Sequence, residues 1–204
     1  RGISKKCLLK NFSRPRAAGL IAVDLADNDE LVEVGLTDGE SDILLFSSAG
    51  KVIRFSEGHV RPMGRTARGV RGIKLKSNQA VISMLIINNG TGEAKVLIAT
   101  ENGYGKRTKL SDFPRKNRGG QGVIAIKVGE RNGLLVGAQL VLDDDDLILI
   151  TGGGRLVRTR AKEVTVVGRN TQGVRLMRLG EQEQLTSLGK VVEEAVDELR
   201  PDEA

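Results

Sequence analysis

The chain repeats itself four times, and this repetition constrains its fold more than any other feature. Each repeat opens on a glycine that is followed four residues later by a lysine or arginine. A second glycine, followed by Val or Leu, comes 17 or 19 residues after the first. The first glycines are Gly2, Gly50, Gly103 and Gly154, and the second ones are Gly19, Gly69, Gly122 and Gly173. A period of 48 to 53 residues is too long for a helical hairpin and fits a blade of about four strands in a propeller-like array.

A complete repeat contains four apolar segments of strand length, so the fold class is all-β. The first segment follows the first glycine, as in Gly50–Phe55. The second alternates apolar and basic residues, which is typical of a strand with one buried face. The second segments are Ile73–Leu75, Ile126–Val128 and Met177–Leu179; the third are 31–36, 81–87, 134–140 and 185–191; the fourth are 43–46, 96–99 and 147–150.

We therefore predict a single domain over residues 1–192, with repeats at 2–49, 50–102, 103–153 and 154–192. The last repeat has no fourth strand, because the sequence becomes acidic after Val192. A closed ring would take the missing strand from the start of the chain, where the sequence opens directly on a repeat. We expect either further chain upstream in the native protein or an open arc with an exposed strand edge.

The charge is unevenly distributed along the chain. The formal net charge is +6, yet residues 191–204 carry six acids and one base, so residues 1–190 carry +11. A basic body with an acidic tail indicates a polyanionic partner, and the alternative is a soluble protein with a solvated end. Cys7 is the only cysteine, which favours a reducing compartment. No apolar stretch is long enough to span a membrane, and no signal peptide is visible.

A loop of about a dozen residues joins the first segment to the second glycine, and it is the most basic part of each repeat. Because blades repeat around an axis, we expect these loops to recur along one rim, where cations at regular spacing suit a bent phosphate backbone. The alternative is that they serve only solubility. The residues assigned to DNA contact are Lys5, Lys6, Arg14, Arg16, Arg54, Arg61, Arg65, Arg68, Lys106, Arg107, Arg115, Lys116, Arg118, Arg158, Arg160 and Arg169.

No residue pattern predicts catalysis, a metal site or a cofactor. The four adjacent acids Asp143–Asp146 lack calcium-loop spacing and alternate in direction, so we expect a solvated turn. The glycine runs near Gly103 and Gly154 lack P-loop spacing and coincide with repeat junctions. His59 is the only histidine, and Tyr104 lies in a repeat turn where the other repeats carry Lys51, Ile3 and Arg155.

Three longer motifs resemble the C-terminal domain of the bacterial DNA gyrase A protein: Asn102–Thr108, Lys127–Leu134 and Gly168–Val174. The resemblance implies a β-pinwheel, usually of six blades, of which these would be the last four. It also implies a non-catalytic domain that wraps duplex DNA around a basic outer rim in a right-handed sense. Such wrapping supports negative supercoiling by a holoenzyme of the gyrase A and gyrase B proteins. ATP and Mg²⁺ would act in other domains, and the location would be the bacterial cytoplasm, at the nucleoid.

The family's basic heptapeptide, Gln-Arg-Arg-Gly-Gly-Lys-Gly, has only a partial counterpart here. The segment Lys116–Gly122 matches it at Arg118, Gly119, Gly120 and Gly122, so we interpret it as the same loop in a later blade. Two alternatives stay open: the C-terminal domain of a topoisomerase IV protein, and a propeller-type scaffold for protein interaction. We also expect the acidic tail, 193–204, to compete with DNA for the basic rim.

Overall fold

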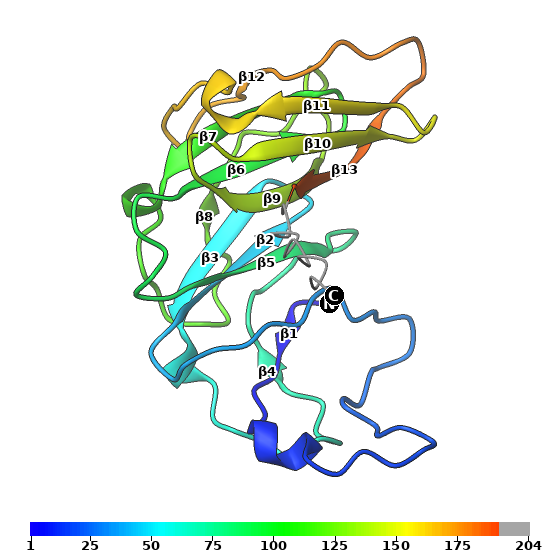
Figure 1. Ribbon diagram of the computed structural model, residues 1–204, viewed down its shortest axis with the longest axis vertical. Helices are drawn as coiled ribbons and strands as arrows, with labels where there is room; N and C mark the ends of the chain where they lie inside the picture. The colour runs from blue at the N-terminus through cyan, green and yellow to red at the C-terminus, as the bar shows by residue number, and fades with distance from the viewer. Residues whose placement is uncertain (192–204) are drawn as a thin grey trace, which may run out of the picture.

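The computed structural model describes residues 1–191 as an all-β structure in which four antiparallel sheets follow one another along an arc (Figure 1). The strands are β1 (Ile3–Ser4), β2 (Asp42–Ser47), β3 (Lys51–Ser56), β4 (Val70–Arg71), β5 (Val81–Ile87), β6 (Lys95–Thr100), β7 (Tyr104–Lys109), β8 (Val123–Ile124), β9 (Leu135–Val141), β10 (Asp146–Thr151), β11 (Leu156–Arg160), β12 (Val174–Arg175) and β13 (Leu185–Lys190). A short 3₁₀ helix follows the first strand of each repeat: η1 (Leu9–Phe12), η2 (Glu57–His59), η3 (Leu110–Asp112) and η4 (Ala161–Glu163).

Each complete sheet combines strands from three successive repeats. In the order β5-β2-β3-β8, the middle strand β2 comes from the first repeat, β3 and β5 from the second, and β8 from the third. The next sheet, β9-β6-β7-β12, is built in the same way one repeat later. The strand register shifts at the same place in both, after Phe46 and after Ala99. The blades are therefore interlocked by exchanged strands, and no repeat forms a sheet alone.

The middle strands are the most buried part of the fold, as their unbroken apolar runs predict. All six residues of β2 are buried, and five of six in β6. Side chains of neighbouring sheets then pack into three hydrophobic clusters, one centred on Phe46 and Phe113, one on Leu97 and Leu147, and one on Phe55. The first two clusters draw residues from three successive repeats and the third from two, so adding a repeat extends a continuous core.

The third segment of the first repeat, predicted as a strand over 31–36, is not a strand. In the other three repeats the third strand pairs only with the middle strand that the preceding repeat donates: β5 with β2, β9 with β6, and β13 with β10. Among residues 1–191 the first repeat has no such middle strand beside it. Its own sheet contains only β1 and β4. The segment consequently leaves its apolar side chains exposed, with Val34 and Leu36 above 70%.

The second segments also differ from the prediction, because the strands observed there are only two residues long and end before the predicted segments begin. These strands, β4, β8 and β12, directly follow the second glycines of the last three repeats. Ile73, Ile126 and Met177 are buried and the basic residue after each is exposed, so the predicted alternation of sides is confirmed although the segments are not strands. Their backbone N–H groups instead donate to the turn glycine of the preceding repeat, as in Ile126 N to Gly50 O at 3.2 Å.

Candidate nucleic-acid interface

The basic residue four positions after each first glycine fastens one repeat to the next. Lys6 Nζ donates to the carbonyl of Glu57 at 3.1 Å, Arg54 Nη1 to the carbonyls of Leu110 and Phe113 at 3.2 Å, and Arg107 Nε to Val164 O at 2.7 Å. Each acceptor lies in or directly after the 3₁₀ helix of the following repeat. We call these three contacts the joints. They give Glu57 O and Leu110 O a second donor beside the backbone N–H of Val60 and Phe113. They also supply a donor to the carbonyls of Phe113 and Val164, which directly follow the short helices.

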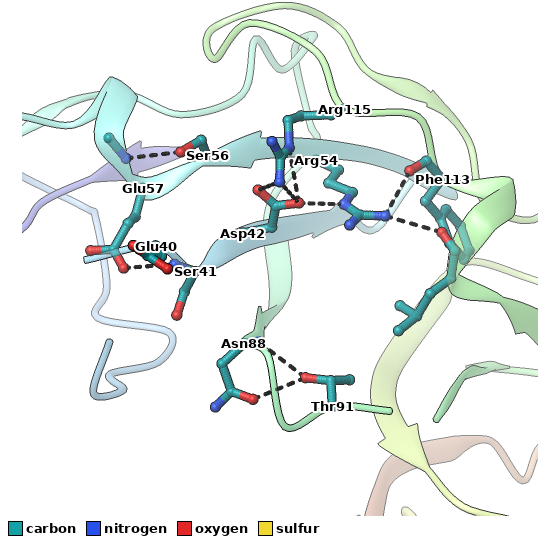
Figure 2. A network of polar contacts seen from close by, with 12 residues as sticks. Glu40, Ser41, Asp42, Arg54, Ser56, Glu57, Asn88, Thr91, Phe113 and Arg115 are labelled. Carbon is teal, nitrogen blue, oxygen red and sulfur yellow. Dashed lines mark hydrogen bonds and ion pairs between the residues drawn. The ribbon is translucent and has the colours of Figure 1, made fainter. Parts of the chain in front are cut away.

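A carboxylate completes each joint, and Figure 2 shows the one at Arg54. Asp42, the buried first residue of β2, accepts from Arg54 Nε at 2.8 Å and from Arg115 Nη2 at 3.0 Å. The exposed Arg115 thereby ties the loop of the third repeat to a strand donated by the first (Figure 2). At the other joints, Glu57 pairs with Lys6, and Asp143 pairs with Arg107.

The joints give part of the sequence-based assignment a structural role. Arg107 is 4% exposed and the side chain of Lys106 is fully buried, so neither presents a cation to a phosphate at the surface. Lys106 Nζ donates to Gly168 O at 2.8 Å, Arg169 O at 2.5 Å and Thr171 Oγ1 at 3.2 Å. Burial lowers the pKa of Lys106 to about 8. Lys6, Arg54 and Arg107 occupy the same position in three repeats and make the same joint there.

Lys5 occupies the position of Lys106 in the first repeat and makes a similar contact. Its Nζ donates to the carbonyls of Arg65 and Ala22. In the second repeat the same position is Ile53, which is buried in the hydrophobic cluster around Phe55. A lysine at this position therefore holds the following loop by hydrogen bonds, while an isoleucine does so by packing.

A second series of arginines links each loop back to the preceding repeat. Arg65 donates to Ile21 O at 3.1 Å, Arg118 to Arg71 O at 3.0 Å, and Arg169 to Ile124 O at 2.9 Å. Each acceptor lies two residues after the second glycine of the previous repeat. These guanidinium groups are half-buried and keep further N–H donors, so they can hold the loop and contact an anion together.

The remaining assigned residues are exposed, and they divide by whether a carboxylate neutralises them. Arg68 pairs with Asp24 at 3.0 Å, and Arg158 and Arg160 both pair with Asp146. Within residues 1–191, four assigned side chains make neither an ion pair nor a hydrogen bond: Arg14, Arg16, Arg61 and Lys116. These four carry the loop charge that is most accessible to a partner.

Sequence reasoning left one regular set of exposed cations out of the assignment. Lys74, Lys127 and Arg178 each lie five residues after a second glycine and are exposed. The backbone N–H of Lys74 donates to Gly120 O, and that of Lys127 to Thr171 O, both at 2.8 Å. Lys74 and Lys127 therefore border the basic loops of the third and fourth repeats. The alternation of Ile, Lys and Leu around Lys74 was the signal that could have identified them.

The acidic tetrad forms a turn, as predicted, but its carboxylates are paired rather than simply solvated. Asp143 binds Lys95 and Arg107, Asp144 binds Lys162, Asp145 binds Lys190, and Asp146 binds Arg158. Hydrogen bonds from Lys95 and Arg107 lower the pKa of Asp143. In residues 1–191 no group of three or more His, Cys, Asp or Glu side chains is arranged to hold a metal ion. No helix in that range is long and apolar enough to cross a membrane.

A family model described as the DNA gyrase C-terminal domain, β-propeller, matches the chain over residues 1–38, 41–88, 94–141 and 145–191. The chain belongs to the DNA gyrase C-terminal domain family. The last three matches begin one residue before β2, β6 and β10. The family's repeating unit therefore starts at the exchanged middle strand, one strand earlier than the glycine at which we placed each repeat.

Curated relatives and solved structures agree with this family. The chain is 55% identical to the DNA gyrase A protein of Salmonella typhimurium over 97% of its length, and 54% identical to that of Pseudomonas aeruginosa over 94%. It spans only 22% and 20% of those proteins. The solved C-terminal domain of DNA topoisomerase IV superposes with a TM-score of 0.87 at 26% identity, covering 94% of this chain and 59% of that one. The DNA gyrase A C-terminal domain gives 0.77 at 28%, covering 86% and 59%.

These comparisons bear on two of the predictions. The β-pinwheel architecture is confirmed, because the sheets exchange strands and both solved neighbours share the fold. The gyrase resemblance is confirmed over nearly the whole chain by relatives at 50–55% identity. The acidic tail, 193–204, lies outside the described residues.

Proposed function

We propose that this domain binds duplex DNA along its basic loops with little sequence preference and wraps it around the outside of the arc. In the parent enzyme, such wrapping would support negative supercoiling by an assembly of the gyrase A and gyrase B proteins in the bacterial cytoplasm, at the nucleoid. The chain would need no cofactor of its own, and ATP and Mg²⁺ would act in other domains. The identity of 55% to the gyrase A protein, against 26% to the topoisomerase IV domain, favours gyrase as the parent.

The observation that carries the proposal is the exposed cation at the same place in three consecutive repeats, Lys74, Lys127 and Arg178. Lys74 and Lys127 lie beside the loops that carry Lys116 and Arg169. Regularly spaced cations without base-reading elements neutralise phosphates and release counterions, which gives salt-dependent binding with weak sequence preference. Bending a 20–30 bp segment costs about 1–6 kcal/mol, and only several blades acting together can supply that.

A topology assay tests the proposal directly. The chain is incubated with nicked circular DNA, the nick is sealed, and the linking number is read after the protein is removed. We expect a positive shift that grows with protein concentration. The triple variant R61Q, K74Q and K127Q should abolish the shift, whereas R1Q, K95Q and K190Q together, at residues outside the basic loops, should keep it. The two variants lose the same charge, so the comparison isolates position. Binding without any shift would contradict wrapping, and no binding at low salt would contradict the function.

A further inference from the structure

Tyr104, the only tyrosine of the chain, lies between two arginines that come from different turns. Arg175 on β12 is its direct partner across the two-residue ladder with β7, and its Nη2 donates to the Tyr104 hydroxyl at 3.1 Å. The guanidinium carbon of Arg175 is 5.6 Å from the ring centroid, and that of Arg131 is 4.8 Å from it. Both distances are within cation–π range, so the ring holds two cations next to each other.

A third arginine, Arg178, faces the same place. A depression of about 410 Å³ is lined by Asn102, Tyr104, Arg131, Arg175, Met177, Arg178 and Leu179. No carboxylate lines it, and in the described part of the chain none of these arginines forms an ion pair. This contrasts with the joints, where each cation faces a carboxylate, as Arg54 faces Asp42.

The depression also contains a hydrogen-bond donor that has no acceptor, the O–H of Tyr104. Because a guanidinium can only donate, the bond from Arg175 uses the Tyr104 oxygen as acceptor and leaves its O–H free to donate. Within residues 1–191 that O–H has no acceptor. The hydrogen bonds from Arg175 and Arg131 lower the pKa of Tyr104, which shows that this environment favours negative charge.

The fold itself does not require this cluster. At the preceding pair of repeats, the positions of Tyr104, Arg131 and Arg175 are occupied by Lys51, Asn78 and Ile124. The turn glycine is held there just as it is at Gly103. The same backbone arrangement therefore forms where Lys51 is the only cation among these three positions. Packing of the backbone does not account for the cluster of two arginines and a tyrosine.

The cluster is continuous with a basic loop of the proposed DNA path. Arg131 Nη1 donates to Gln172 Oε1 at 3.4 Å, and the buried Asn132 donates to Gln172 O at 3.3 Å. Gln172 belongs to the loop that carries Arg169. A strand of DNA lying on that loop would therefore reach the depression without a gap.

We propose that Arg131, Arg175, Arg178 and the Tyr104 hydroxyl form a subsite for a backbone phosphate of duplex DNA. Three guanidinium groups and one O–H around a recess without carboxylates match the oxygens of a phosphodiester. A stacked base is not the ligand, because guanidinium groups already cover the ring. The subsite rests on the proposed function, which it extends beyond the loops to one specific contact.

The single tyrosine makes the subsite directly observable. The full chain is produced with 3-fluorotyrosine, which gives one ¹⁹F resonance, and is titrated with a short mixed-sequence duplex. Binding is followed in parallel by the anisotropy of a labelled duplex, and a second titration uses inorganic pyrophosphate as a source of free phosphate. We expect the resonance to move saturably with the duplex at the same concentrations as the anisotropy, and pyrophosphate to compete only weakly.

Variants give the second readout. R131Q, R175Q and R178Q together should weaken duplex binding about tenfold and reduce the salt slope by about 0.9, the value for one phosphate contact. The control variant R1Q, K95Q and K190Q, at residues outside the basic loops, loses the same charge and should change binding less than twofold. Y104F removes only the O–H and should weaken binding a few-fold while leaving thermal unfolding unchanged.

The outcomes separate the two proposals. Duplex binding with an unmoved ¹⁹F resonance, or equal losses in the cluster and control variants, overturns the subsite alone. A resonance that moves with pyrophosphate and not with the duplex overturns the duplex as its ligand. Absence of any duplex binding at low salt overturns the proposed function and the subsite with it.

Discussion

Arg107 on β7 donates through Nε to the backbone carbonyl of Val164, 57 residues further along the chain, at 2.7 Å. Its Nη2 donates to Lys162 O at 3.2 Å and its Nη1 to Asp143. The guanidinium thus closes the start of the fourth repeat onto the third. The residue at the same position of the last repeat, Arg158, is 57% exposed and pairs with Asp146 at the surface. The same position of the repeat is therefore buried and structural at Arg107 in the third repeat, and exposed at the surface at Arg158 in the fourth.

This difference predicts unequal costs of the same substitution. Arg107→Ala should lower the free energy of unfolding by about 3 kcal/mol, because it removes a buried charged donor and leaves two carbonyls unsatisfied. Arg158→Ala should cost less than about 1 kcal/mol, as exposed ion pairs usually do. Urea unfolding followed by circular dichroism measures both. Equal losses would show that the joint does not hold the repeats together.

Two turn glycines, Gly50 and Gly154, allow a second comparison of the same substitution at matched positions. Gly50 and Gly154 both have a positive φ, 70° and 81°, a conformation that costs other residues about 1–2 kcal/mol. A Cβ on Gly50 would lie 2.3 Å from Ile126 O, whereas one on Gly154 would meet nothing within 4 Å. Gly154→Ala should therefore cost only the backbone strain, and Gly50→Ala clearly more.

Thermal and urea unfolding of the two glycine variants provide the comparison. Because the backbone angle is nearly the same, the excess loss in Gly50→Ala measures the close approach of the next repeat. The ¹⁵N–¹H spectrum of Gly154→Ala serves as the control for an intact fold. Losses that agree within error would mean that the chain around Ile126 moves aside without cost.

The sequence predicted the strand positions well where a segment has its neighbouring strands among the described residues. The apolar runs 43–46 and 96–99 lie inside β2 and β6, and 81–87 coincides with β5. The prediction was wrong over 31–36, because that segment depends on a partner strand that a preceding repeat would donate, and residue periodicity cannot show which repeat supplies a neighbour. An apolar alternating run has the same pattern whether or not its partner is present.

The candidate site was predictable in its charge but not in the roles of individual residues. The recurrence of Lys6, Arg54 and Arg107 is equally compatible with a phosphate contact and with a structural joint. Only the carbonyls around each side chain, 51 or more residues away in sequence, distinguish the two. The Tyr104 cluster escaped prediction for the same reason, since its three arginines belong to segments 27 to 74 residues beyond the tyrosine.

Acid should weaken the first joint in a way that depends on Glu57. Burial raises the pKa of this carboxyl, but hydrogen bonds from Thr37, Lys6 and the N–H groups of Ser41 and Gly39 outweigh it, so the net pKa lies below the ordinary 4.5. A depressed carboxyl pKa contributes stability that is present above pH 4.5 and is lost as the pH falls through the folded-state value. E57Q should lower the free energy of unfolding by about 2 kcal/mol at pH 7, since buried N–H and ammonium donors lose a charged acceptor.

Urea unfolding of the wild type and E57Q between pH 7 and pH 3 measures this contribution. The gap between the two proteins should narrow below pH 4.5, because the protonated Glu57 then resembles glutamine. E40Q, at an exposed neighbouring carboxyl, should show no such narrowing. A constant gap across the range would mean that Glu57 stays ionised or that its charge contributes nothing.

Alkaline pH should raise the free energy of unfolding through Lys106, whereas acid lowers it through Glu57. Burial lowers its pKa from 10.5 to about 8, so between these values the unfolded chain binds more protons than the folded one, and stability rises with pH. K106M removes this titration, and K109M removes an exposed lysine of the same strand. The free energy of unfolding of the wild type relative to K106M should increase from pH 8 to pH 10.5, whereas relative to K109M it should stay flat. Parallel curves for wild type and K106M would show that the three oxygens around Nζ keep the folded-state pKa of Lys106 close to that of the unfolded chain. The loop of Gly168 and Thr171 would then be held by a charged ammonium across this pH range.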